Sequence, residues 1–352
     1  MLFMIYFLGF IILSATFGMA KSSWNEKNYL KVGLFVILLI VEFMGFVFVK
    51  EMYKKDVRES VKQQYSQSKT LVEEKNPVEV TVATPNHEIY IEHQQINKNE
   101  PEIHDELTPI NMNDYEVCNN RGMNYHDSGQ YELAIQEFNK AVEINPNLAV
   151  LYYNRGISYR HLNQYEQAIQ DYNKAIELDQ NYWNAYNNRG LAYYKLGLIE
   201  RAIQDFNKAI ELNPNSYQAY DNRGNAYRNS GQNERAVQDY SKAIELNPNN
   251  YMAYNNRGLA FLMQEKCESA IRDFNKALEL NPNFDMAYSN RGIAYGALGN
   301  FNQAIADSTK AIEINPNFAN AYYIRGLIYQ ELGDMKKAQA DFAKTKELGY
   351  NG

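Results

Sequence analysis

The sequence is poor in cysteine and tryptophan, and it has no excess of basic residues. Only 2 of its 352 residues are Cys, which excludes a fold held together by disulfide bonds. It has 35 Lys and Arg residues and 42 Asp and Glu residues, which gives a net charge of −7. It therefore lacks the excess of basic residues that is typical of nucleic-acid-binding proteins. We therefore expect no nucleic-acid partner.

Sequence motifs of catalysis are also missing. The chain contains no Gly-rich phosphate loop, no HExxH and no GxSxG motif. His126 and His161 are a candidate pair of metal ligands. The sequence offers no third ligand beside them, and zinc sites need at least three protein ligands. We expect neither an enzyme nor a site for a cofactor or a metal ion.

Tyrosine, by contrast, is abundant: 29 Tyr and 16 Phe stand beside 2 Trp, as if one aromatic position were copied many times. The dipeptide Arg-Gly recurs every 34 residues, with its arginine at 121, 155, 189, 223, 257, 291 and 325. Such a fixed period is the signature of a repeat protein. Seven units follow one another without a gap: 115–148, 149–182, 183–216, 217–250, 251–284, 285–318 and 319–352.

Each unit contains two helical patterns separated by a turn. Glycine stands at this turn in five units, whereas Asn163 and Glu265 replace it in the second and fifth units. Asn-Pro-Asn closes five units, and proline ends a helix. The second unit ends in Asp179-Gln180-Asn181 instead, so we expect its turn to be less firmly set.

Further residues recur at fixed places in each unit. Counted from the first residue of a unit, an aromatic residue recurs at position 4 in six units, glycine at position 8, an aromatic residue at position 11 and alanine at position 20. With these residues, the units resemble the tetratricopeptide repeat. Tyr and Arg stand where the family pattern has Trp and Leu. The resemblance implies an all-α fold, a right-handed solenoid of seven helix-turn-helix repeats over 115–352, with each first helix lining a concave groove.

An arginine at position 7 and an acid at position 23 occur in every unit. In the geometry of the family, position 7 faces the neighbouring helices, so we expect a structural ladder of ion pairs. The arginines are Arg121, Arg155, Arg189, Arg223, Arg257, Arg291 and Arg325, and the acids are Glu137, Asp171, Asp205, Asp239, Asp273, Asp307 and Asp341.

Asparagine occupies position 6 in all units except the last, which has Ile324. In the family this position lines the groove, and a carboxamide can pair with both polar groups of a peptide main chain. The series resembles the asparagine ladder of O-linked N-acetylglucosamine transferases, which implies a row of peptide-binding residues. The alternative is that Asn is simply a soluble, tolerated groove residue in this repeat subtype. The residues are Asn120, Asn154, Asn188, Asn222, Asn256 and Asn290.

Two apolar runs precede the repeats. Residues 2–20 and 32–49 are close to the length that crosses a bilayer, and together they predict a membrane hairpin within 1–55. Cleavage of 1–20 as a signal peptide is the alternative, although the basic start of a signal peptide is missing. Basic residues after the second run favour an integral membrane protein whose repeat domain faces the cytoplasm.

Residues 56–114 contain four of the nine prolines and many acidic residues, so we expect a flexible acidic linker. Its possible occupation of the groove is left open. The whole pattern favours a membrane-anchored scaffold that binds an extended peptide or a helix of a partner protein. The alternative is a structural assembly subunit that works through its convex face or its membrane hairpin, with no ligand in the groove. A homo-oligomer is a further option.

Overall fold

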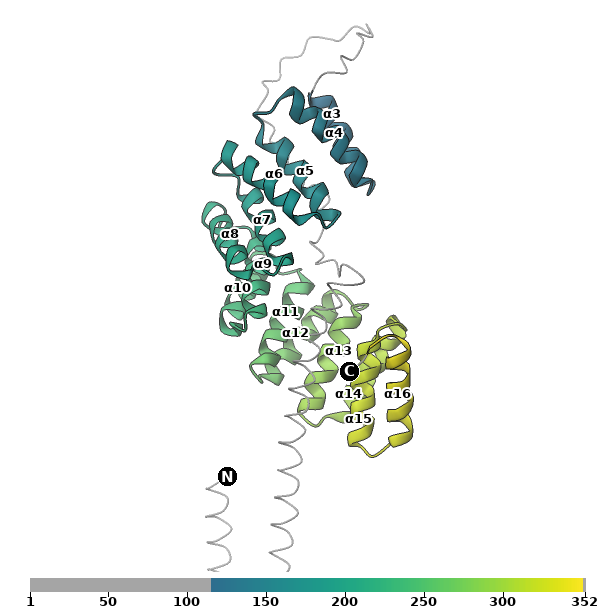
Figure 1. Ribbon diagram of the computed structural model, residues 1–352. Helices are drawn as coiled ribbons and strands as arrows, with labels where there is room; N and C mark the ends of the chain where they lie inside the picture. Colours follow the sequence, from purple (N-terminus) through teal and green to yellow (C-terminus); the bar gives the residue numbers. More distant parts are fainter. Residues whose placement is uncertain (1–114, 351–352) are drawn as a thin grey trace, which may run out of the picture. The chain divides into compact units, whose positions relative to one another are not determined.

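Residues 115–350 are described here from a computed structural model. They form an all-α array with two helices in each 34-residue unit and no strand (Figure 1). The fourteen helices are α3 (Tyr115–Asp127), α4 (Tyr131–Ile144), α5 (Ala149–His161), α6 (Tyr165–Leu178), α7 (Trp183–Lys195), α8 (Ile199–Leu212), α9 (Tyr217–Asn229), α10 (Asn233–Leu246), α11 (Tyr251–Met263), α12 (Cys267–Leu280), α13 (Asp285–Ala297), α14 (Phe301–Ile314), α15 (Ala319–Glu331) and α16 (Met335–Glu347).

Consecutive helices pack as hairpins, and consecutive hairpins stack in chain order (Figure 1). Within a repeat, the first helix packs most extensively against the second, as α7 does against α8. The second helix also packs against the first helix of the next repeat, and neighbouring first helices touch along one side. The result is the solenoid of helical hairpins that the sequence predicts, because no repeat buries its apolar residues alone.

The turn inside each hairpin depends on one residue in the left-handed region. Glycine adopts a φ of 74° to 78° at Gly129, Gly197, Gly231, Gly299 and Gly333. The substitutes Asn163 and Glu265 adopt the same conformation, with φ of 58° and 63°. A side chain with a Cβ pays a steric cost there that glycine does not, and Asn tolerates it better than Glu.

The turn between repeats is held by a side chain that imitates a backbone turn. In the first repeat, Asn145 Oδ1 accepts a hydrogen bond from the backbone N–H of Asn147, and the four later Asn-Pro-Asn turns repeat this bond. Asp179 Oδ1 accepts the same bond from Asn181 at 2.9 Å. The second repeat therefore has the same turn, because a carboxylate can replace the amide oxygen.

A small residue on each helix brings the two helices of a hairpin together. The alanine at position 20 is fully buried in all seven repeats. Glycine at position 8 faces the side chain at position 24 of the same repeat, which is Phe or Tyr in six repeats. A Cβ built on Gly190 would lie 2.7 Å from Phe206 Cε1, which is too close for two carbon atoms. The ring therefore occupies the space that a larger residue at position 8 would need.

The membrane location expected from the sequence is contradicted. Each helix of residues 115–350 has 13 or 14 residues, whereas a span needs about 20, and none of them is long and apolar enough to cross a membrane. The expected spans at 2–20 and 32–49 and the expected linker at 56–114 lie outside the described residues. An integral membrane protein with its repeat domain facing the cytoplasm is thus not supported by the described helices.

We predict that Gly190→Ala destabilises the protein by about 1–3 kcal/mol, because the new methyl group displaces the packed ring of Phe206. Gly292→Ala is the matched control. Its position faces Ser308 instead of a ring, with Oγ at 3.2 Å, so the helix propensity of alanine offsets the tighter contact. Urea unfolding of both variants measures the difference, and equal losses would contradict this account of the core.

Candidate functional site

In six of the seven repeats, the arginine at position 7 joins three helices. In the third repeat, Arg189 Nε and Nη2 donate to Asp205 at 2.8 and 2.7 Å, which is a bidentate ion pair inside one repeat. Arg189 Nη1 donates to Asn173 Oδ1 at 2.6 Å, and Asn173 belongs to the second helix of the preceding repeat. One guanidinium thus fixes its own hairpin and the hairpin before it.

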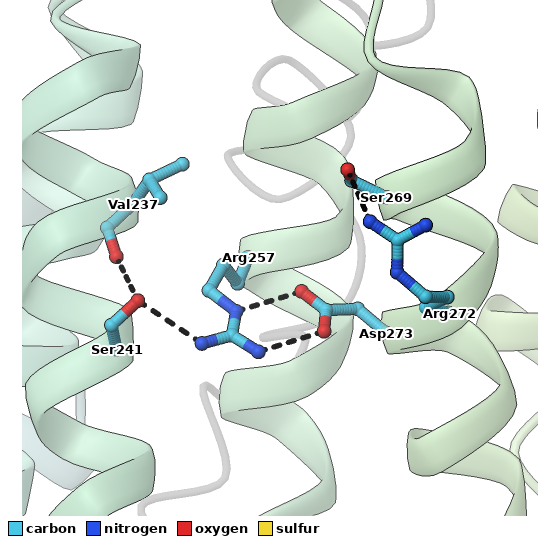
Figure 2. Close-up of polar contacts among 6 residues, drawn as sticks. All are labelled: Val237, Ser241, Arg257, Ser269, Arg272 and Asp273. Carbon is cyan, nitrogen blue, oxygen red and sulfur yellow. Dashed lines mark hydrogen bonds and ion pairs between the residues drawn. The ribbon is translucent and has the colours of Figure 1, made fainter.

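The same three-way contact recurs in the second to seventh repeats, at Arg155, Arg189, Arg223, Arg257, Arg291 and Arg325. Figure 2 shows it at Arg257, which lies between Asp273 on α12 and Ser241 on α10. Ser241 Oγ itself donates to the backbone oxygen of Val237 at 2.7 Å (Figure 2). The residue at position 25 that accepts the third bond varies among Asn, Ser and Thr.

The environment of these ion pairs is partly dry. The arginine side chains of the second to seventh repeats are 17–20% exposed, and the paired aspartates are 7–9% exposed. The ring of the tyrosine at position 4 lies against each guanidinium, with centroids 5.4–5.7 Å from Cζ. The bond to Asp273 raises the pKa of Arg257, so this arginine stays charged.

The first repeat lacks the third contact. Arg121 Nη2 lies 2.7 Å from Glu137 Oε2, but its side chain is 42% exposed and no described repeat precedes it. Its Nε is buried without a hydrogen-bond partner among the described residues. Cys118 stands at position 4 in place of tyrosine and accepts a long bond from Arg121. The ladder is therefore weakest at this end.

The asparagines at position 6 connect neighbouring first helices. Asn154, Asn188, Asn222 and Asn290 are only 3–7% exposed. Each donates from Nδ2 to the residue at position 5 of the preceding repeat, at 3.0–3.1 Å: Asn154 to Asn119, Asn188 to the hydroxyl of Tyr153, Asn222 to Asn187, and Asn290 to Asn255. In the last repeat, Asn320 donates to Ser289 instead, beside the buried Ile324.

These bonds limit what the asparagines can offer to a ligand. Their use in binding a peptide main chain remains a prediction, since five of the amides, that of Asn256 with Asp221 included, already bond between repeats. Asn120 is exposed, whereas Asn256 is half-buried and hydrogen-bonds Asp221, so Asn120 is the most accessible member of the series. The sequence did not reveal the bonds, because the partner at position 5 changes from Asn to Tyr, Asp or Ser.

Positions 12 and 13 form a second row of contacts between first helices. The ring centroids of His126 and His161 are 5.0 Å apart, and Tyr131 stacks on His161 at 4.7 Å. Burial lowers the pKa of His126 to about 4 and that of His161 to about 3, so both are neutral near pH 7. Within residues 115–350, no three residues of metal-binding type come together, so this pair gains no third ligand.

Further along this row, Asn229 donates to the hydroxyl of Tyr194. In the contacts made by positions 5 and 6, and in those made by positions 12 and 13, the two residues are 35 apart in the chain. Position 5 contacts position 6 of the next repeat, and position 12 contacts position 13 of the next repeat, so successive first helices are in register along the array. Because residues three or four apart share one side of a helix, positions 2 and 9 lie on the same side. We call the surface made by positions 2, 5, 6, 9, 12 and 13 of the seven first helices the first-helix face.

A single carboxyl group lies in the middle of this face. Asp221 sits between Asn225 and Asn256, and its Oδ1 is buried without a hydrogen-bond partner among the described residues. Burial raises the pKa of Asp221 to about 6, although Asn256, Arg228 and Asn225 act in the opposite direction. A carboxyl group in such a position is partly neutral near pH 6.

Comparisons with known proteins agree with the fold. Sequence models described as TPR repeat match residues 122–160, 156–197 and 224–265, and models of the tetratricopeptide repeat match 183–216, 251–284, 286–318, 206–238 and 309–340. Together these matches span more than half of the chain. No curated protein matches the sequence significantly.

Three solved structures illustrate the similarity. A tetratricopeptide repeat protein from Parabacteroides merdae is 26% identical, with a TM-score of 0.56, and the match covers 67% of this chain and 94% of the other. A chain of the APC/C hetero-tetramer Cut9–Hcn1 is 20% identical, with a TM-score of 0.57, covering 67% of this chain and 47% of that one. PilF of Pseudomonas aeruginosa is 18% identical, with a TM-score of 0.53, covering 62% and 96%. The last two matches concern the fold alone.

We predict that Arg189→Met costs about 3–5 kcal/mol, because Asp205 keeps a partly buried charge without its partner. Arg121→Met is the matched control and costs less, since Arg121 is exposed and contacts no earlier repeat among the described residues. The double variant Arg189→Met with Asp205→Leu regains part of the loss. Thermal unfolding checks all three, and an unchanged Tm for Arg189→Met would show that the ladder adds nothing to stability.

We also predict that Asp221 makes the protein less stable as the pH rises from about 4 to about 6. The pKa of Asp221 is raised in the folded state above the ordinary value of 3.8, so the folded protein holds the proton more tightly and loses this advantage through that window. Asp221→Asn removes this titration. The Tm of the variant minus that of the wild type therefore grows between pH 4 and pH 7, and a constant difference would contradict the assignment.

Proposed function

Because the chain belongs to the tetratricopeptide repeat family, we propose that it is a scaffold that binds an extended segment or a helix of a partner protein on the first-helix face. This family assignment supports a role in protein–protein interaction. It does not identify the ligand, which must be inferred from the side chains on the face.

The observation that carries the proposal is the register between first helices. Contacts between residues 35 apart, such as Asn222 with Asn187 and Asn229 with Tyr194, align the same positions of successive repeats along one surface. Side chains at positions 9, 12 and 13 differ from repeat to repeat, whereas the ladder, the glycines and the buried alanines are kept. A rigid frame that presents variable side chains in fixed register suits recognition of a linear segment.

The asparagine row has a limited part in this proposal. Asn120 is accessible enough to bind the main chain of a peptide, whereas Asn256 would first have to give up its bond to Asp221. Asn154, Asn188 and Asn222 would have to give up their bonds to the preceding repeat, so we propose that they mainly hold the first helices in register.

The alternative of an assembly subunit that works through the convex face finds less support in the described residues. Outside the first-helix face, the large apolar side chains that are exposed belong to the first, third and seventh repeats and do not form one patch. They are Leu133, Ile144, Leu198, Leu332 and Met335. Single exposed apolar residues are normal on a protein surface and do not mark an interface.

Photo-crosslinking tests the proposed face on the full chain. Peptides are first selected from a random phage-displayed library, and a photoreactive phenylalanine analogue then replaces Met263, on the face, or Glu211, an exposed residue of α8. We expect selected peptides to crosslink at 263 and not at 211. Crosslinks at 211 alone, or a failure to select any peptide, would contradict the proposal.

A further inference from the structure

Two cations of neighbouring repeats lie together on the first-helix face. Arg160 is at position 12 of the second repeat and Lys195 is at position 13 of the third, the same pair of positions that brings His126 to His161 and Tyr194 to Asn229. Burial lowers the pKa of Lys195, and the charge of Arg160 lowers it further, so the two groups are close enough to repel each other.

Nothing in the described residues balances these charges by an ion pair. The arginines of the ladder and the lysines at position 26, on the second helices, each have a carboxylate within 4 Å. Within residues 115–350, neither Arg160 nor Lys195 forms an ion pair. The Nε of Arg160 is buried and makes no hydrogen bond in that part of the chain. Two like charges held together in a half-buried place cost stability, and an anion between them removes that cost.

The other half of the face has the opposite character. In the fifth and sixth repeats, positions 2, 5, 6, 9, 12 and 13 carry no charged side chain. Leu259 and Met263 are half-buried there, and Met286 is 37% exposed. Methionine is flexible and polarisable, so such a surface adapts to apolar side chains of varied shape.

We propose that the bound partner is an acidic segment, an inference that rests on the proposed function. The segment places a carboxylate between Arg160 and Lys195, and apolar side chains on Leu259, Met263 and Met286. Packed helices lie about 8–10 Å apart, so the two or three repeats between these places measure roughly 20–30 Å. An extended chain covers this distance with about six to nine residues. The partner segment thus has an acidic residue and an apolar cluster at that separation.

Charge complementarity is the reason to choose this occupant. A carboxylate between a guanidinium and an ammonium group makes charge-assisted hydrogen bonds with both. The whole chain has a net charge of −7, so an acidic partner would be repelled from most of the protein and attracted at this place. A second copy of the chain is the alternative occupant.

The peptides selected by the full chain test the composition of the ligand. We expect them to be enriched in Asp or Glu, with apolar residues about six to nine positions away. Peptides that bind but show no acidic enrichment would overturn this inference and leave the proposed function standing. A selection that yields no peptide would remove both.

Variants test the two cations, with fluorescence anisotropy of one selected peptide as the measurement. Arg160→Gln and Lys195→Gln are each expected to weaken binding at least ten-fold, and added salt should weaken the wild type more than either variant. Lys208→Gln is the matched control, because Lys208 pairs with Glu211 on the second helix of the third repeat. Equal binding by the Gln variants and the wild type would overturn the inference.

Stability separates a binding role from a structural one. Lys195→Gln removes a repulsion, so its Tm is expected to equal or exceed that of the wild type, whereas a lysine that holds the fold together would lower the Tm when replaced. Lys195→Glu should regain binding when the acidic residue of the peptide is changed to Lys. Self-association of the chain that the selected peptide does not disrupt would point to a second copy and overturn the choice of an acidic partner.

Discussion

In the second to seventh repeats, the arginine at position 7 holds a pair of repeats at once, and the stacking of the array depends on this contact. Arg257 illustrates it: two nitrogen atoms bind Asp273 in its own hairpin, and the third reaches Ser241 in the preceding one. A guanidinium is planar and always charged, so it can serve two directions without rotating. The distance between hairpins and the pairing within them are therefore fixed by one side chain.

Much of this fold could be predicted from residues that recur at fixed spacing. The period of 34, the turn glycines, their substitutes Asn163 and Glu265, and the alanines at position 20 each have a local physical meaning that needs no coordinates. The apolar runs before residue 56 had an equally clear pattern, yet the described helices do not support the location inferred from them. A sequence pattern predicts the secondary structure of its own segment, but it says less about the location of the whole protein.

The candidate site was harder to predict, because it is made by residues that do not recur. Asn222 finds its partner Asn187 one repeat away, but the equivalent partner of Asn188 is Tyr153. Arg160 and Lys195 occupy different positions of their repeats and become neighbours only through the offset of 35 residues. The repeated residues thus build the frame, while the residues that vary between repeats give the face its chemistry.

The sixth repeat has a consequence for how the array deforms. Ser308 replaces the ring that fills the hairpin elsewhere, and its hydroxyl is buried without a hydrogen-bond partner among the described residues. A core with less contact area resists bending less, so we expect curvature to change most easily near α13 and α14. Compliance at that place would let the apolar part of the face adjust to ligands of different lengths while the basic part stays rigid.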